Sequence, residues 1–487
     1  MKFAARFLVL CAVACSVLAA RPAPQGLGPL LDRMRAVNGG LFNAHIVSTS
    51  RHLVDNAPAI LTTHVQDFRY RQDQCTGSVC LGTYFDGERL FSVNINDTAL
   101  PRSQAPEARV RALRILAMLA FLQPHFDGTI YDNGSTIFMG RRVRAVIVSD
   151  PVALPLRIFV DPQTGLVTGA QDLNREETYV MRDYRRVGTF VLPFQILLNG
   201  QPLETYITRQ VVSGALGTPQ GLRSQTVPGV NPAVSLDPDS VSPLGTCTLG
   251  TVKVSCLIDS GNSAMSMSVE LAEQLNLPPV GMLRVSGLGN YATEVVHAGP
   301  LRVGNQQFDP ANYFVLSDIH KYGYDLVVGA DVLASLPVTI DYKKHEMYLD
   351  PKTAIASGGT SVPLAFQNFV PVVNVRLGGE QSALAVDTGD QSNINLGYDY
   401  YKQHPELFQA TKTRSVSGVG GDSVELIGEI GSVSIGSITA EHQQIGTTET
   451  LHGTADGHLG AGFLSKYRVV LDYAHQLMRL LPIPPVR

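Results

Sequence analysis

The chain has 487 residues, of which 44% are hydrophobic and only 16% are charged, which excludes a disordered protein. Its formal net charge of −4 argues against nucleic-acid binding, which normally needs a surplus of Lys and Arg to offset the phosphates. The length predicts about three domains. The 45 Gly and 29 Pro predict many short strands and turns, so we expect a mainly β fold.

Residues 1–20 have the pattern of a secretory signal peptide. Two basic residues precede an apolar run over 7–18, and Ala19-Ala20 offers a cleavage site of small residues. The run is shorter than the roughly 20 apolar residues that a membrane-spanning helix needs. We therefore expect residues 1–20 to be removed and the mature chain to be secreted or periplasmic, without a transmembrane segment. A lipid anchor at Cys15 is a less favoured variant.

Four cysteines remain after the signal, at Cys75, Cys80, Cys247 and Cys256. The first two flank a short turn, and the other two lie on adjoining strand-like segments. In an oxidising compartment either pair could close, although four cysteines allow three connectivities. Metal binding is not expected, because the sequence has no second cluster and no suitably spaced His partners.

Residues 27–213 predict an α+β domain. Strand-like runs alternate with turns, and 106–122 is an amphipathic helix with Val110, Leu113 and Leu116 at helical spacing. This order favours a curved antiparallel sheet packed on a helix. By pattern it resembles the half-barrel domains of bacterial lipoprotein carriers. The segment 214–243 is rich in Gly, Pro and Ser, which indicates a linker.

The remaining chain repeats itself, as one segment over 244–352 and a second over 360–485. Asp387 lies at an offset of 128 from Asp259, and three further matched blocks are each offset by 131. The matched blocks are Cys256–Gly261 with Ala385–Gly389, Val285–Gly289 with Val416–Gly420, Gly329–Leu333 with Gly460–Leu464, and Val338–Tyr342 with Val469–Tyr473. Such duplication predicts a pseudo-twofold pair within one chain, hence a monomer with an internal pseudo-dimer.

Each repeat presents an Asp at the end of an apolar strand. A twofold arrangement would bring Asp259 and Asp387 together, and two carboxyl groups a few ångströms apart share one proton. The ionised group can then activate a water while the protonated group polarises a carbonyl. Neighbouring residues would support the pair: Ser260 and Thr388 by hydrogen bonds across the axis, Gly261 and Gly389 by allowing a close approach.

These motifs resemble the retropepsin-like aspartic peptidases, in particular bacterial secreted forms with two such units in one chain. Asp259-Ser260-Gly261 and Asp387-Thr388-Gly389 carry the resemblance, together with the apolar-Gly signals Val327-Val328-Gly329 and His458-Leu459-Gly460. The resemblance covers about half of the chain. It implies two β-barrel units, no metal or cofactor, and a peptide or protein substrate bound in extended conformation.

The family also implies two flaps. The Gly-rich stretches about 30 residues after each Asp, Gly287-Leu288-Gly289 and Gly418-Val419-Gly420, would form hairpins that close on a peptide. Plain surface hairpins are the alternative for these stretches.

Three residues depart from the family pattern. Asn262 and Asp390 stand where a small residue is usual, and His458 replaces an aliphatic one. If Asp390 points inward, its charge would raise the pKa values of the pair; if outward, it is a solvated loop charge. We expect a secreted aspartic endopeptidase. The alternative is a catalytically weak carrier or scaffold that binds peptides or lipids.

Overall fold

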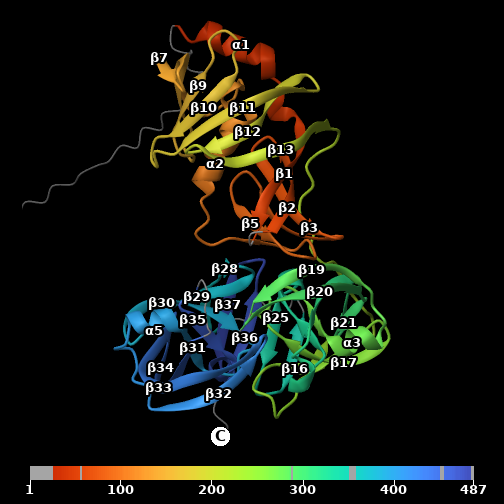
Figure 1. The fold of residues 1–487 in the computed structure, drawn as a ribbon. Coiled ribbons are helices and arrows are strands. Elements are labelled where there is room, and N and C mark those ends of the chain that lie inside the picture. The colour runs from red at the N-terminus through yellow and green to blue at the C-terminus, as the bar shows by residue number, and fades with distance from the viewer. Residues whose placement is uncertain (1–25, 55–56, 287–288, 350–357, 450–454, 484–487) are drawn as a thin grey trace, which may run out of the picture. The chain divides into compact units, whose positions relative to one another are not determined.

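The computed structural model describes residues 26–54, 57–286, 289–349, 358–449 and 455–483. The predicted signal peptide, with Cys15, lies outside these residues, as do Gly287 and Leu288 of the first predicted flap. The fold is mainly β, as predicted, with curled sheets (Figure 1). Among the helices of the described residues, none is both long and apolar enough to cross a membrane.

The chain forms two compact units, each built from separate stretches of sequence. Among the described residues, unit 1 holds 26–44 together with Ala108–Thr205, and unit 2 holds those within His45–Glu107 and 206–483. This division differs from the predicted boundaries, which place 27–213 in one domain. Strand β13 (Gln201–Val212) crosses from one unit to the other.

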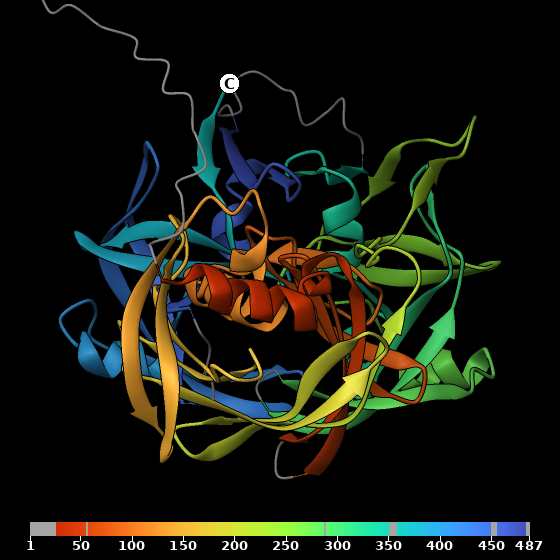
Figure 2. The same ribbon diagram turned by 90° about the horizontal axis from the view of Figure 1, so that it is seen from above.

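Unit 1 is a half-barrel of antiparallel strands that follow one another in chain order. Its sheet curls around α1 (Gly28–Asn38) and α2 (Glu107–Met118) (Figure 2). Ala112, Ile115 and Leu116 form the buried stripe of α2, and this amphipathic pattern is why the helix packs on the sheet. The predicted helix over 106–122 is confirmed as α2 followed by the 3-10 turn η2 (Ala120–Leu122). The other elements are η1 (Leu41–Asn43), β7 (Thr129–Phe138), β8 (Arg141–Ser149), β9 (Leu156–Val160), β10 (Val167–Asp172), β11 (Thr178–Val187) and β12 (Phe190–Leu198).

Unit 2 begins with an antiparallel meander whose first strand pairs with β13. Its strands are β1 (His45–Val54), β2 (Ala57–Gln66), β3 (Arg69–Thr76), β4 (Val79–Phe85), β5 (Leu90–Val93) and β6 (Ala99–Pro101). A disulfide between Cys75 and Cys80 closes the β3–β4 hairpin.

The two repeats of unit 2 build their sheets in the same order of equivalent strands. In the first repeat the order is β16 (Leu244–Leu249), β17 (Val252–Ile258), β24 (Leu326–Val328), β18 (Ser266–Ser268), β23 (Ala311–Leu316), β20 (Asn290–Ala298) and β19 (Pro279–Ser286). In the second it is β29 (Val370–Leu377), β30 (Glu380–Asp387), β35 (Gly457–Gly460), β31 (Ile394–Gly397), β34 (Ile438–Thr448), β33 (Gly421–Ile435) and β32 (Lys412–Gly418). Equivalent short helices follow in each: α3 (Val269–Gln274) with α5 (Tyr398–Gln403), and α4 (Ala330–Ser335) with α6 (Ala461–Leu464). The first repeat also has β21 (Leu301–Val303), β22 (Gln306–Phe308) and η3 (His320–Tyr322), and the second has β28 (Ala365–Gln367).

A further sheet joins the two repeats. Its order is β15 (Ala233–Ser235), β26 (Glu346–Leu349), β25 (Val338–Asp341), β36 (Tyr467–Asp472), β37 (Leu477–Pro482) and β27 (Thr360–Pro363). Ile340 of the first repeat pairs with Val469 of the second, so the hydrophobic core runs from one repeat into the other.

The predicted linker and cysteine pairs have defined places in this unit. The linker residues include β14 (Ser224–Thr226), which pairs with β22, and β15, which pairs with β26. A second disulfide joins Cys247 of β16 to Cys256 of β17. Two disulfides fit an extracellular protein.

Candidate active site

The two predicted aspartates leave equivalent strands. Asp259 directly follows β17, and Asp387 is the last residue of β30. Each of these strands pairs in parallel with a short strand, the apolar β24 in the first repeat and β35, which carries His458, in the second. A strand with neighbours on both edges and buried side chains fixes the position at which its last carboxyl group emerges.

The two Asp loops are locked to each other by hydrogen bonds of Ser260 and Thr388, whose side chains are fully buried. The Ser260 hydroxyl donates to the carbonyl of Val386 (2.7 Å), and the Thr388 hydroxyl donates to the carbonyl of Ile258 (2.7 Å). Each hydroxyl also accepts a backbone N–H of the other residue, both at 3.0 Å. Because each loop closes the other, neither carboxyl group can shift without breaking buried hydrogen bonds.

Gly261 and Gly389 allow the carboxyl groups to approach the facing loop. A Cβ atom on Gly261 would lie 2.5 Å from Cγ of Asp387, and one on Gly389 would lie 2.6 Å from Cγ of Asp259. The glycine N–H groups also orient the nearer carboxylates: Gly261 donates to Asp259 Oδ1 (2.8 Å) and Gly389 to Asp387 Oδ1 (2.9 Å). Any larger residue at either position would push the loops apart.

The two carboxyl groups act on each other directly. Each carboxyl group lies against the glycine of the facing loop, and the carboxyl group of Asp387 is near enough to act on Asp259. Burial raises the pKa of Asp259 well above its ordinary value, and the nearby charge of Asp387 raises it further. A carboxylic acid therefore stands beside a second carboxyl group, and the pair can hold one proton between them.

His458 and Asp390, which the sequence marks only as departures, are neighbours of this pair. His458 Nδ1 lies 3.4 Å from Asp387 Oδ2 and 3.6 Å from Asp390 Oδ2. Asp390 thus lies beside an imidazole, with its side chain 19% exposed, and the backbone N–H of Ser392 donates to its other oxygen (2.8 Å). Asn262, the counterpart of Asp390, donates from its amide to the Ser266 hydroxyl (3.0 Å).

Gly418-Val419-Gly420 lies at the tip of the hairpin β32–β33, and Gly289 directly precedes β20 of the hairpin β19–β20. In the described residues the tips meet: the N–H of Gly289 donates to the carbonyl of Val419 (3.4 Å). A Cβ atom on Gly289 would collide with the carbonyl oxygen of Gly420, so the contact requires glycine here. The N–H of Gly420 also reaches a carboxylate oxygen of Asp318 (3.4 Å).

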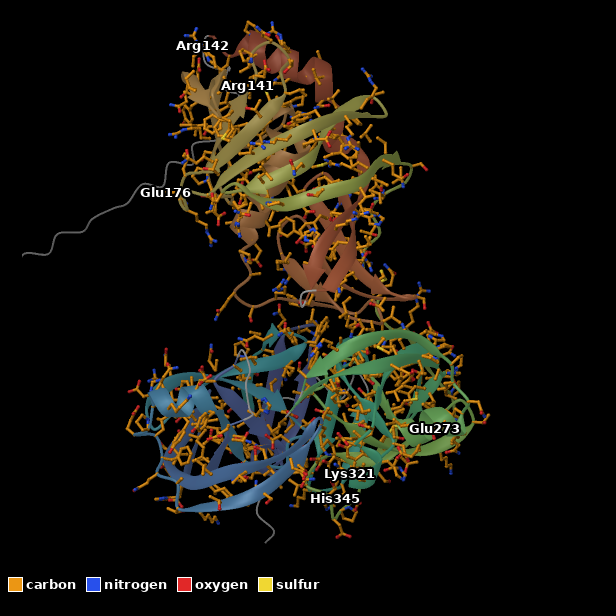
Figure 3. All side chains as sticks on the ribbon, in the orientation of Figure 1. Arg141, Arg142, Glu176, Glu273, Lys321 and His345 are labelled. Atoms are coloured by element: carbon orange, nitrogen blue, oxygen red, sulfur yellow. A yellow bond between two sulfur atoms is a disulfide. The ribbon has the colours of Figure 1, made fainter. Side chains whose placement is uncertain are left out.

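Sequence patterns did not single out several residues around the dyad. The Ser242 hydroxyl, at the end of the predicted linker, donates to the carbonyl of Gly389 (3.1 Å). Tyr324 is close enough for the charges of Asp259 and Asp387 to act on it; burial is the first cause of its raised pKa. These single residues in loops have no repeated counterpart or spacing that could have marked them. Charged side chains such as Glu273, Lys321 and His345 lie instead on the outside of the unit (Figure 3).

Comparison with known proteins adds no family assignment. No protein-family model matches the chain, and a search of curated proteins finds no match. The case for a function therefore rests on the residues and geometry of the chain itself.

Proposed function

We propose that this chain is an aspartic endopeptidase of the retropepsin-like kind, with both catalytic units in one chain. The observation that carries the proposal is the pair of interlocked loops, which hold the carboxyl groups of Asp259 and Asp387 each against the glycine of the facing loop. The equivalent strand orders of the two repeats and the sheet that joins them support a pseudo-twofold relation between those loops.

The reaction needs only water and the two carboxyl groups. The ionised carboxylate takes a proton from a water molecule, whose oxygen attacks the carbonyl carbon of the peptide. The protonated carboxyl group gives its proton to the carbonyl oxygen, which leaves a neutral tetrahedral diol. Proton transfer to the amide nitrogen then allows the C–N bond to break, giving one carboxylic acid and one amine. The dyad ends with the single shared proton with which it began.

The hairpins β19–β20 and β32–β33 would supply the substrate contacts. Flap tips that meet over a site exclude water and offer backbone groups to an extended peptide. A scaffold or carrier function would leave the carboxyl groups free to turn apart, because it needs no shared proton. The interlocked loops, which hold both carboxyl groups in place, favour the enzyme.

The test is cleavage of a peptide library from acid to neutral pH, with products identified by mass spectrometry. We expect the wild-type protein to cleave peptides and a statine-type inhibitor to block it. Asp387→Asn should lower the rate by roughly 10³-fold or more, because an amide cannot take the proton from water. Its unfolding temperature should stay close to that of the wild type.

Asp239→Asn is the matched control, since this exposed residue lies in the predicted linker. It makes the same change in charge and should leave the cleavage rate unaltered. Wild-type turnover in the Asp387→Asn variant would show that the dyad does not carry the activity.

A further inference from the structure

The two aspartates have matching loops but different charged neighbours. At the offset of 131 between the repeats, His458 of the second repeat corresponds to Val327 of the first. Three positions after the catalytic Asp, the second repeat has Asp390 and the first has Asn262. A charged pair in the second repeat thus replaces an apolar and a neutral side chain in the first.

Of the two catalytic aspartates, Asp387 is the one that this pair contacts at salt-bridge distance. His458 Nδ1 lies between Asp387 Oδ2 at 3.4 Å and Asp390 Oδ2 at 3.6 Å. Its ring belongs to β35, which runs parallel to β30 and pairs His458 with Ala385, two positions before the catalytic Asp. The imidazole is therefore held by the same backbone ladder that positions Asp387.

We infer that His458 is a positioning residue: as an imidazolium held by Asp390, it keeps Asp387 ionised and leaves the shared proton of the dyad on Asp259. The inference rests on the proposed function and makes it more specific. Asp387 becomes the base that takes a proton from water, and Asp259 becomes the acid that protonates the carbonyl oxygen.

The other charged groups around His458 agree with this assignment. Burial alone would lower the pKa of His458, but its contact with Asp390 and the charges of Asp387, Asp390 and Asp259 outweigh burial and raise it. Burial alone would raise the pKa of Asp390, but its contact with His458 and the hydrogen bond that it accepts from the Ser392 N–H outweigh burial and lower it.

More distant charges act on Asp390 and on the dyad. Glu425 of β33 lies near enough for its charge to act on Asp390, and it is paired with Arg414 (2.5 Å). Tyr324 and Tyr473 lie near enough for the charges of both aspartates to act on them, and burial raises the pKa of both phenols. Both rings are therefore neutral where the carboxyl groups titrate, and they add no charge that would compete with His458.

The direct test is the pH dependence of kcat/KM in His458→Val, which copies Val327 of the first repeat. A cation beside Asp387 favours ionisation of the dyad, so its loss should move the acid limb of the profile upward. An opposite charge at this distance predicts a shift of about one pH unit, or about tenfold in rate on that limb. His475→Val is the control, because its exposed imidazole pairs with Asp472 away from the dyad. The control should leave the limb in place.

A second measurement needs no activity. In the protein labelled on its imidazoles, NMR titration should place the pKa of His458 above the ordinary 6.5. Both Asp390→Asn and Asp387→Asn should lower it, since each removes one of the two anions that it touches. Unfolding temperatures of all variants show whether they are folded.

The outcomes separate this inference from the proposed function. If the wild type cleaves peptides but His458→Val keeps the wild-type acid limb, the inference is wrong and the peptidase stands. If no peptide is cleaved, the proposed function fails, and the NMR titration still tests the ion pair. An equal His458 pKa in the wild type and in Asp387→Asn would show that His458 and Asp387 do not form an ion pair, and the inference would be wrong. A moved limb together with a responsive His458 supports both.

Discussion

At the residue scale, the interlocked loops hold the carboxyl groups of the dyad close together and buried, which is electrostatically unfavourable. Asp259 and Asp387 each receive one glycine N–H, and Ser260 and Thr388 close the loops. These hydrogen bonds fix a carboxyl group beside another one, where it would not stay in water. Sites built in this way are functional at the expense of stability.

Replacing Asp259 by Asn should therefore stabilise the protein at neutral pH while abolishing cleavage. The pKa of Asp259 is raised in the folded protein, so between its unfolded value of 3.8 and its folded value the native state binds more protons. The free energy of unfolding contributed by this group thus falls as pH rises through that window. The Asn side chain of the variant does not titrate, so the variant does not lose this stability. We expect a gain of about 1 kcal/mol at neutral pH in urea unfolding. Below the unfolded pKa the gain should vanish.

Asp239→Asn again serves as the control, because an exposed carboxylate should show no such gain. Equal stability of wild type and Asp259→Asn at both pH values would mean that the carboxyl pair costs nothing. The two Asp positions themselves were predictable from the repeated Asp-Ser/Thr-Gly motif. The placement of His458 beside Asp387 was not, because an isolated histidine has no pattern until β35 places it beside β30.

At the element scale, the hairpin β3–β4 braces the hairpin β19–β20, which is the first proposed flap. The N–H of Ser78, at the hairpin tip, donates to the carbonyl of Val280 in β19 (3.1 Å). Val79 is buried in a cluster with Leu283 of β19 and Val295 of β20. The Cys75–Cys80 disulfide holds this tip in its hairpin form. Residues far away in sequence thus set how firmly the first flap is held.

Val79→Ala should loosen that flap selectively. It removes two buried methyl groups, which should cost about 1–2 kcal/mol. Amide hydrogen exchange should become faster in β19 and β20, with little change in β32 and β33. Val241→Ala is the control, since Val241 is an exposed valine of the same unit. Unchanged exchange in β19 would contradict the brace.

The strands of the repeats could be predicted because their blocks recur at constant spacing, and α2 because its apolar residues follow helical periodicity. The brace could not. It depends on one backbone hydrogen bond and one valine, and neither alters the alternation of polar and apolar residues in β3, β4 or β19. Contacts between distant elements have no signature in the local sequence.

At the scale of the whole molecule, contacts between segments far apart in sequence also explain where the compact units divide. Asp331 is fully buried in α4 of the first repeat, and its carboxylate accepts four hydrogen bonds. Three come from side chains of the loop between β5 and β6 and one from a backbone N–H: Asn94 Nδ2 (2.7 Å), Thr98 Oγ1 (2.7 Å), Asn96 Nδ2 (2.9 Å) and Met265 N–H (2.9 Å). The second repeat has Gly462 at this position, so only the first repeat binds the loop in this way.

The predicted boundary at residue 213 follows a change in composition toward Gly, Pro and Ser. The carboxylate of Asp331 and the polar loop follow no such change, and they join His45–Glu107 to the repeats although the two segments are far apart in sequence. Composition indicates where a chain is irregular. It does not indicate which side of the irregular segment a preceding strand packs against.

Two deletions distinguish the division into compact units from the predicted boundary at residue 213. A chain that joins 45–107 to 206–487 through a flexible Gly-Ser linker keeps every donor to Asp331 and the flap brace, so it should unfold cooperatively and cleave peptides. A chain of 214–487 leaves the Asp331 carboxylate buried without its three side-chain donors, at about 1–3 kcal/mol for each unsatisfied group. It should therefore be several kcal/mol less stable in urea unfolding. Asp331→Ala in that shorter chain should recover part of the loss, because it removes the stranded charge. Equal stability of the two deletions would show that the N-terminal strands add nothing to the fold of the repeats.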